Sequence, residues 1–137
     1  MATLQELFQK AVDTPYEQRV LLAKESLGKC YAHLNAINGG DKDTSADALT
    51  LFLAGIISVD GKYSAKEAQM VSAIFGKDII ADVLDILTPE IFEDMDKLVD
   101  SLPEDTKLEF CTLALSILAV DGELTVDEQS YLYKLLD

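Results

Sequence analysis

The sequence has no tryptophan, one histidine and two cysteines, so it offers few of the side chains that most often carry catalysis. Cys30 and Cys111 lie in apolar helical stretches without the spacing of a metal site, and we expect both to be reduced and buried. His33 has no serine or cysteine partner in a nucleophile motif, and we expect it at the surface or at a helix cap. No G-x-S-x-G, glycine-rich phosphate loop or H-E-x-x-H motif occurs. We therefore expect a protein without enzymatic activity.

Positive charge is also scarce. The chain has 11 basic and 25 acidic side chains, for a formal net charge of −14. A field of this sign repels phosphate backbones and anionic lipid surfaces, so we expect no nucleic-acid partner. The same field concentrates cations near the surface, and it favours divalent metals or a basic protein as partners.

The sequence lacks an apolar run of the length that crosses a membrane. Its longest runs, residues 48–59 and 110–120, are about half of the roughly 20 residues that a membrane-spanning helix needs. The first residues, MATLQELFQK, have neither the basic start nor the apolar stretch of a secretory signal. Together with reduced cysteines, this predicts a cytoplasmic protein with no direct membrane insertion.

Helical periodicity, in contrast, runs through the whole chain. Apolar residues recur at three-and-four spacing between the few prolines and glycines, and no segment calls for a strand. We expect one all-α domain over residues 1–137, a bundle of about seven to eight helices around a single core. Residues 1–40 should form an N-terminal helical pair, and residues 45–137 a duplicated core.

Caps and breakers place the expected helices. Thr3-x-x-Glu6 and Thr14-x-x-Glu17 are capping boxes for the first two helices. Further helices are expected over residues 45–59, 64–75 and 79–87, from Thr88-Pro89 to about residue 101, from about residue 103 to Val120, and from Thr125 onward. The helices that end near residues 59 and 120 are apolar nearly all round, which predicts that other helices surround them.

These two apolar helices belong to an internal repeat whose offset of 61 residues is the separation of Asp60 from Asp121. The segment IISVDGKYSAKEAQMVSAIF aligns with LAVDGELTVDEQSYLYKLL. The aligned pairs are Val59/Val120, Asp60/Asp121, Gly61/Gly122, Ser64/Thr125 and Glu67/Glu128. Each copy predicts a helix, an Asp-Gly turn, a hydroxyl cap and a second helix. We expect the two helical hairpins to pack about a pseudo-two-fold axis, an arrangement that would let the two turns approach each other.

The duplicated V-D-G-x-x-[ST]-x-x-E motif, with each copy following a buried helix, resembles the TerB-like family of tellurite-resistance domains. The resemblance covers about residues 45–137 and leaves residues 1–40 outside it. It implies an all-helical bacterial protein that acts in the response to tellurite and other chemical stress. It also implies that the acidic motif residues bind a divalent metal.

The motif matches the second half of the twelve-residue calcium loop, D-x-[DN]-x-[DN]-G-x5-E. Asp60 and Asp121 fall at loop position five, and Glu67 and Glu128 fall at the bidentate position twelve. Positions one and three are occupied by Ile56, Ser58, Ile117 and Ala119. Three of those four lack a side-chain oxygen, so one copy alone should bind weakly. Two copies together would offer four carboxylates, enough for calcium, magnesium or manganese completed by water.

The same residues also have a purely structural interpretation. Ser64-x-x-Glu67 and Thr125-x-x-Glu128 are capping boxes, in which the Glu accepts from the amide of its own cap residue. Each box stabilises a helix start by about 1 kcal/mol, and Asp-Gly is an ordinary turn dipeptide. Capping does not require an Asp before the box, whereas a metal site would use one. Asp60 and Asp121 are therefore the residues that distinguish the two interpretations.

The alternative to metal binding is an acidic protein-interaction module that docks a basic partner. An acidic cluster in the helix after Thr88 is either such a surface or a solvated helix face, and the solvated face is the expected state. The cluster consists of Glu90, Glu93, Asp94, Asp96 and Asp100.

Overall fold

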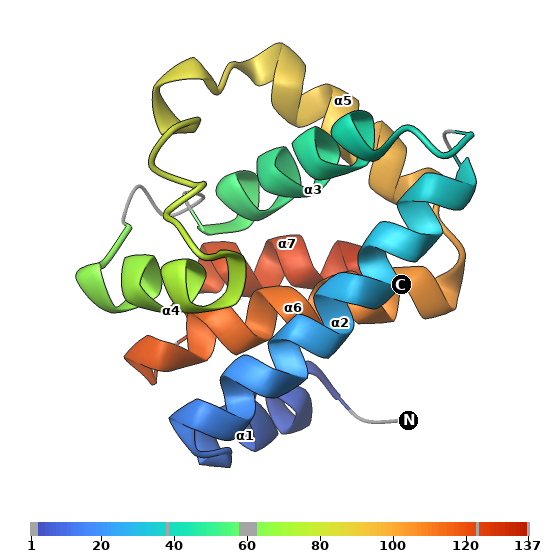
Figure 1. Ribbon diagram of the computed structural model, residues 1–137. Coiled ribbons are helices and arrows are strands. Elements are labelled where there is room, and N and C mark those ends of the chain that lie inside the picture. The colour runs from blue at the N-terminus through green and yellow to red at the C-terminus, as the bar shows by residue number, and fades with distance from the viewer. Residues whose placement is uncertain (1–2, 38, 58–62, 123, 137) are drawn as a thin grey trace.

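The computed structural model describes residues 3–37, 39–57, 63–122 and 124–136, except for the side chains of residues 121 and 134–136. These residues form an all-helical bundle without a strand, as expected (Figure 1). The elements are α1 (Leu4–Asp13), α2 (Tyr16–Ile37), α3 (Lys42–Ile57), α4 (Ala65–Phe75), η1 (Leu84–Ile86), α5 (Pro89–Ser101), α6 (Glu104–Leu118), η2 (Ala119–Asp121) and α7 (Val126–Leu136). No helix in the described part of the chain is both long and apolar enough to span a membrane.

Several helices begin and end at the signals that the sequence provides. Thr3 caps α1, because its hydroxyl accepts from the Glu6 amide at 3.1 Å. Thr88 caps α5 in the same way, accepting from the Ile91 amide at 3.3 Å. Helix α4 ends at Gly76, whose φ of 83° is a left-handed conformation that glycine adopts without strain.

Two helix starts differ from the prediction. Thr14 does not cap α2, which begins two residues later at Tyr16; its hydroxyl instead donates to the Lys10 carbonyl at 2.7 Å, at the end of α1. The capping box predicted at this position is therefore wrong. Helix α3 begins at Lys42, earlier than predicted, because Asp41 accepts from the Thr44 amide at 3.2 Å and caps the helix there.

The segment 79–87 does not form the α-helix that its apolar spacing predicts. The Val83 amide donates to the Ile80 carbonyl at 3.1 Å and the Ile86 amide donates to the Val83 carbonyl at 3.1 Å, so these bonds span three residues. Only Leu84–Ile86 is assigned as a 3-10 helix. Thr88 follows in an extended conformation before Pro89, so this segment could not continue as an α-helix into α5.

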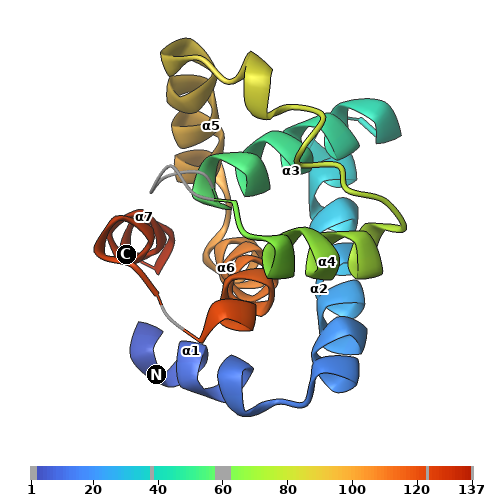
Figure 2. The same ribbon diagram turned by 90° about the vertical axis from the view of Figure 1, so that its left-hand side faces the viewer.

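Helices α3 and α6 lie at the centre of the bundle, as their apolar sequences predict. Helix α6 contacts α1, α2, α3, α4 and α7, and α3 contacts α2, α5, α6 and α7. Figure 2 shows α6 with α7 on one side and α2 on the other. Phe52 of α3 and Phe110 of α6 are fully buried, with their ring centroids 4.9 Å apart. The two copies of the repeat therefore share one core.

The pattern of burial reproduces the 61-residue repeat. Residues 52–57 of α3 are all buried, and so are residues 113–118 of α6, which the repeat aligns with them. The contacts are reciprocal as well, because α3 packs on α7 of the other copy while α6 packs on α4. The buried helix of each copy is thus packed against the second helix of the other copy.

Cys30 and Cys111 are fully buried and form no disulfide, as expected. Burial raises the pKa of each thiol to about 12, and the charge of Glu109 adds to the effect at Cys30. A thiol whose pKa is raised in the folded state stabilises the fold fully only below its unfolded pKa. Stability should therefore fall as the pH rises from about 9 toward about 12.

We expect urea denaturation to show this fall, with a loss of roughly 1–2 kcal/mol for each cysteine by about pH 10. Cys30→Ala combined with Cys111→Ala should make the decline shallower. At neutral pH an aromatic disulfide reagent should modify the two thiols only after urea has unfolded the chain. Rapid modification of the native chain would contradict their burial.

Candidate functional site

The first copy of the motif forms a complete capping box at the start of α4. The Ser64 hydroxyl accepts from the Glu67 amide at 3.0 Å, and Glu67 Oε1 accepts from the Ser64 amide at 2.9 Å. Glu67 is only 4% exposed. The reciprocal pair satisfies two amides that the helix start would otherwise leave without an acceptor.

The second copy builds the same box at the start of α7. The Thr125 hydroxyl accepts from the Glu128 amide at 3.2 Å, and Glu128 Oε1 accepts from the Thr125 amide at 2.9 Å. Glu128 is also 4% exposed. The capping role that the sequence predicts for both glutamates is therefore confirmed.

The two copies differ in the residue before the cap. Tyr63 in the first copy donates from its hydroxyl to Asp78 Oδ1 at 2.6 Å, which ties the start of α4 to the segment after it. Burial is the main cause that raises the pKa of Tyr63, and the hydrogen bond to the Asp78 carboxylate raises it further. The second copy has Leu124 at this place, and its carbonyl accepts from Gln129 Nε2 at 3.0 Å. Only the first copy therefore has this tyrosine tether.

The described residues include only part of the predicted metal site. Asp60 and the side chain of Asp121 lie outside the described part of the chain. Glu67 and Glu128 lie within it, and Oε1 of each accepts from the amide of its own cap. Within the described residues, no three His, Cys, Asp or Glu side chains are grouped so that they could hold a metal ion.

This geometry limits how the two glutamates could hold a cation. Bidentate ligation, as at position twelve of a calcium loop, would require Oε1 to leave the cap amide. Each Glu is already engaged at its own helix start, so the turn aspartates and water would have to supply most of the oxygens around a bound cation.

The acidic cluster on α5 is mostly solvated. Four of its members are exposed: Glu90, Glu93, Asp94 and Asp100. Asp96 is half-buried. Burial of Tyr131 raises the pKa of that tyrosine, and the negative charge of Asp96 raises it further. The half-buried Tyr131 packs against the core, whereas Tyr133 is 39% exposed. His33 is half-buried on α2.

Arg19 is a residue that our sequence analysis missed. It is the only arginine in the chain and is 8% exposed. The signal for its burial is its spacing from Ala23, Ser26 and Cys30, which places it on the buried stripe of α2. A charged side chain on that stripe is uncommon, because burial of an unpaired charge is costly.

No family model matches the chain, and no curated protein or solved structure matches it either. The TerB-like resemblance therefore depends on the duplicated motif in the sequence.

Proposed function

We propose that this chain is a non-enzymatic, TerB-like domain of the bacterial cytoplasm that binds a divalent cation at its duplicated Asp-Gly turns in a response to tellurite or related chemical stress. The main support is that both copies hold their Glu in the same way, buried and with Oε1 2.9 Å from the nitrogen of the cap amide. A carboxylate that is already held in one position loses little side-chain freedom when it binds an ion.

The electrostatics of the chain favour this function but keep the affinity low. A net charge of −14 raises the local concentration of divalent cations. The available ligands are all oxygens, which suit calcium, magnesium or manganese. Because Oε1 of each Glu is held by its cap amide, we expect a Kd of about 0.1–1 mM, at the weak end for calcium modules.

Calorimetric titration of the chelator-treated chain with calcium, magnesium and manganese chlorides tests this proposal. At least one of these metals should bind in the expected range. Asp60→Asn combined with Asp121→Asn should weaken binding by at least about tenfold, since two of the four carboxylates lose their charge. Asp82→Asn with Asp85→Asn removes the same charge from exposed positions outside the motif and should leave the affinity within about twofold. No binding tighter than about 1 mM would refute the metal site.

The completeness of the two capping boxes supports a second function, an acidic module that docks a basic protein. Glu67 and Glu128 each have a structural role that needs no ion. The exposed carboxylates of α5 would then face a surface rich in lysine or arginine, which the charge of the chain attracts.

The same variants separate the two functions. An interaction module should bind a lysine-rich peptide equally well with and without the Asp60→Asn and Asp121→Asn substitutions, and it should release no heat with the three metals. Loss of peptide binding in that double variant would count against the module.

A further inference from the structure

A cavity of about 310 Å³ lies between α1, α2 and α6, and no residue of the duplicated motif lines it. Its volume is at the lower end of the range of small-molecule sites, about 300–1,000 Å³. Its apolar lining consists of Leu7, Ala11, Leu22, Leu108 and Leu115. Leu22 and Leu108 are also 49% and 45% exposed, so the cavity has an apolar rim.

Arg19 lines this cavity and is nine-tenths buried. Its Nη2 donates to the Thr14 carbonyl at 3.0 Å, whereas its buried Nε has no hydrogen-bond partner. No carboxylate of the described residues forms an ion pair with it. Burial lowers the pKa of Arg19, as expected for a cation removed from water. An apolar side chain at this position would avoid the cost of burying an unpaired charge.

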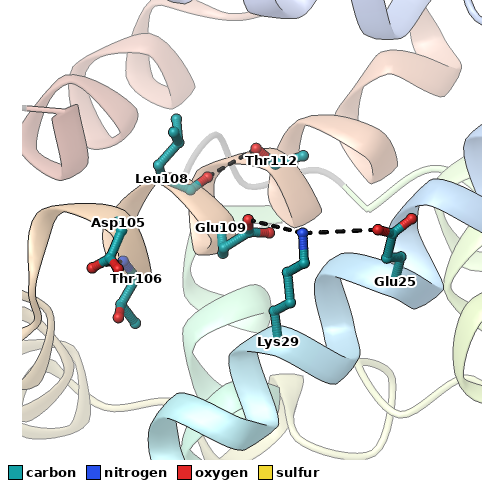
Figure 3. A network of polar contacts seen from close by, with 7 residues as sticks. All are labelled: Glu25, Lys29, Asp105, Thr106, Leu108, Glu109 and Thr112. Atoms are coloured by element: carbon teal, nitrogen blue, oxygen red, sulfur yellow. Dashed lines mark hydrogen bonds and ion pairs between the residues drawn. The ribbon is translucent and has the colours of Figure 1, made fainter.

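The two carboxylates that line the cavity are close to a different cation. Lys29 Nζ lies 3.8 Å from Glu25 Oε1 and 3.6 Å from Glu109 Oε1, and Figure 3 shows it between them. With Lys10 and Arg19, the lining has three cations and two carboxylates. The cavity is thus net positive in a chain whose net charge is −14.

We propose that this cavity binds a small organic monocarboxylate with an apolar body, of the class of medium-chain fatty acids and aromatic acids. The ligand carboxylate accepts from the part of the Arg19 guanidinium that lines the cavity, because a guanidinium is the cation best matched to a carboxylate. The leucine walls cover the apolar body and remove it from water.

The charges of the lining favour one negative charge over two. A single carboxylate balances the excess cation of the cavity, whereas a dianion such as phosphate exceeds that balance and is repelled about twice as strongly by Glu25 and Glu109. Phosphate would in addition leave the leucine walls without an apolar partner. A neutral alcohol of the same chain length would contact the apolar walls but leave the Arg19 guanidinium without a charged acceptor.

Titration of the full chain with octanoate, followed by amide chemical shifts, tests the proposal. Octanoate should bind with a submillimolar to low millimolar Kd, and the shifts should concentrate on α1, α2 and α6. Octanol and inorganic phosphate should each bind at least about tenfold more weakly. Octanol binding as tightly as octanoate, phosphate binding in its place, or no binding of octanoate would each overturn the proposal.

Arg19→Met should weaken octanoate binding by at least about tenfold. It should leave the melting temperature equal or higher, because it removes an unpaired buried charge. Lys24→Met removes the same charge from an exposed position of α2 outside the cavity and should change the affinity by less than about twofold. Unchanged octanoate binding by a folded Arg19→Met variant would contradict the proposed role of the guanidinium.

A second pair of variants tests the cavity without altering any buried residue. Leu108→Asp places a negative charge on the exposed rim and should weaken octanoate binding several-fold by repulsion. Leu21→Asp introduces the same charge at a residue of α2 that is 66% exposed and does not line the cavity. Equal effects of the two substitutions would show that octanoate binds elsewhere, which would overturn the proposal even if Arg19→Met failed to fold.

Discussion

Phe52→Ala should lower the free energy of unfolding by about 3–5 kcal/mol, the range found for buried phenylalanines. Phe52 is fully buried on α3, and its ring centroid lies 4.9 Å from that of Phe110 and 6.5 Å from that of Tyr131. Removal of the ring leaves a cavity where the two copies of the repeat meet, and the rigid central helices can close it only in part. Urea denaturation followed by circular dichroism measures the loss.

The repeat itself supplies a matched control for this substitution. The residue that aligns with Phe52 in the second copy is Leu113, which is also fully buried. Phe52→Leu should therefore be accommodated with a loss of about 1 kcal/mol. A double-mutant cycle with Phe110→Leu should give a coupling energy of about 0.5–1.5 kcal/mol for the aromatic pair. A loss below about 1 kcal/mol for Phe52→Ala would contradict its place in the shared core.

The same residues show why the arrangement of the fold could be predicted from the sequence and its packing could not. The offset of 61 residues matches α3 with α6 because the burial pattern depends only on apolar character. Which side chains meet depends on their size and on the helix crossing. The repeat aligns Phe52 with Leu113 and Leu49 with Phe110, yet the two phenylalanines contact each other. An apolar pattern satisfied by Leu or Phe does not specify that contact.

Errors in the helix limits have a similar origin. The Thr14 hydroxyl could either cap α2 or bond to the preceding turn, and the nearby Lys10 carbonyl is the partner that it takes. In segment 79–87 the apolar spacing is helical, but backbone bonds that span three residues form there and Thr88 is extended before Pro89. Which hydrogen bonds form at such helix ends depends on local backbone geometry, and the spacing of apolar residues in the sequence does not specify that geometry.

The two candidate sites also differ in whether a local sequence pattern indicates them. The capping boxes could be predicted because each is contained within four consecutive residues. The cavity of Arg19 requires three helices whose lining residues extend from Leu7 to Ser116, so no local pattern indicates it. The one available signal was a lone arginine on a buried stripe.

Glu67→Ala combined with Glu128→Ala should lower the free energy of unfolding by about 2–4 kcal/mol. Each substitution removes the acceptor of a cap amide at 2.9 Å and leaves a space where a buried carboxylate was. The two boxes cap different helices, α4 and α7, so the two losses should be nearly additive. Urea denaturation of the single and double variants measures this directly.

Glu67→Gln combined with Glu128→Gln distinguishes the effect of the capping hydrogen bonds from the effect of the negative charges. A capping box accepts Gln in place of Glu, since the amide oxygen can still accept from the cap amide. We therefore expect each substitution to cost less than about 1 kcal/mol, well below the cost of alanine. Metal affinity should nevertheless fall by at least about tenfold if the proposed site is present, because a neutral amide oxygen attracts a divalent cation less strongly. If Gln destabilises the fold as much as Ala does, the negative charge of the glutamates, rather than their capping geometry, stabilises these two helix starts.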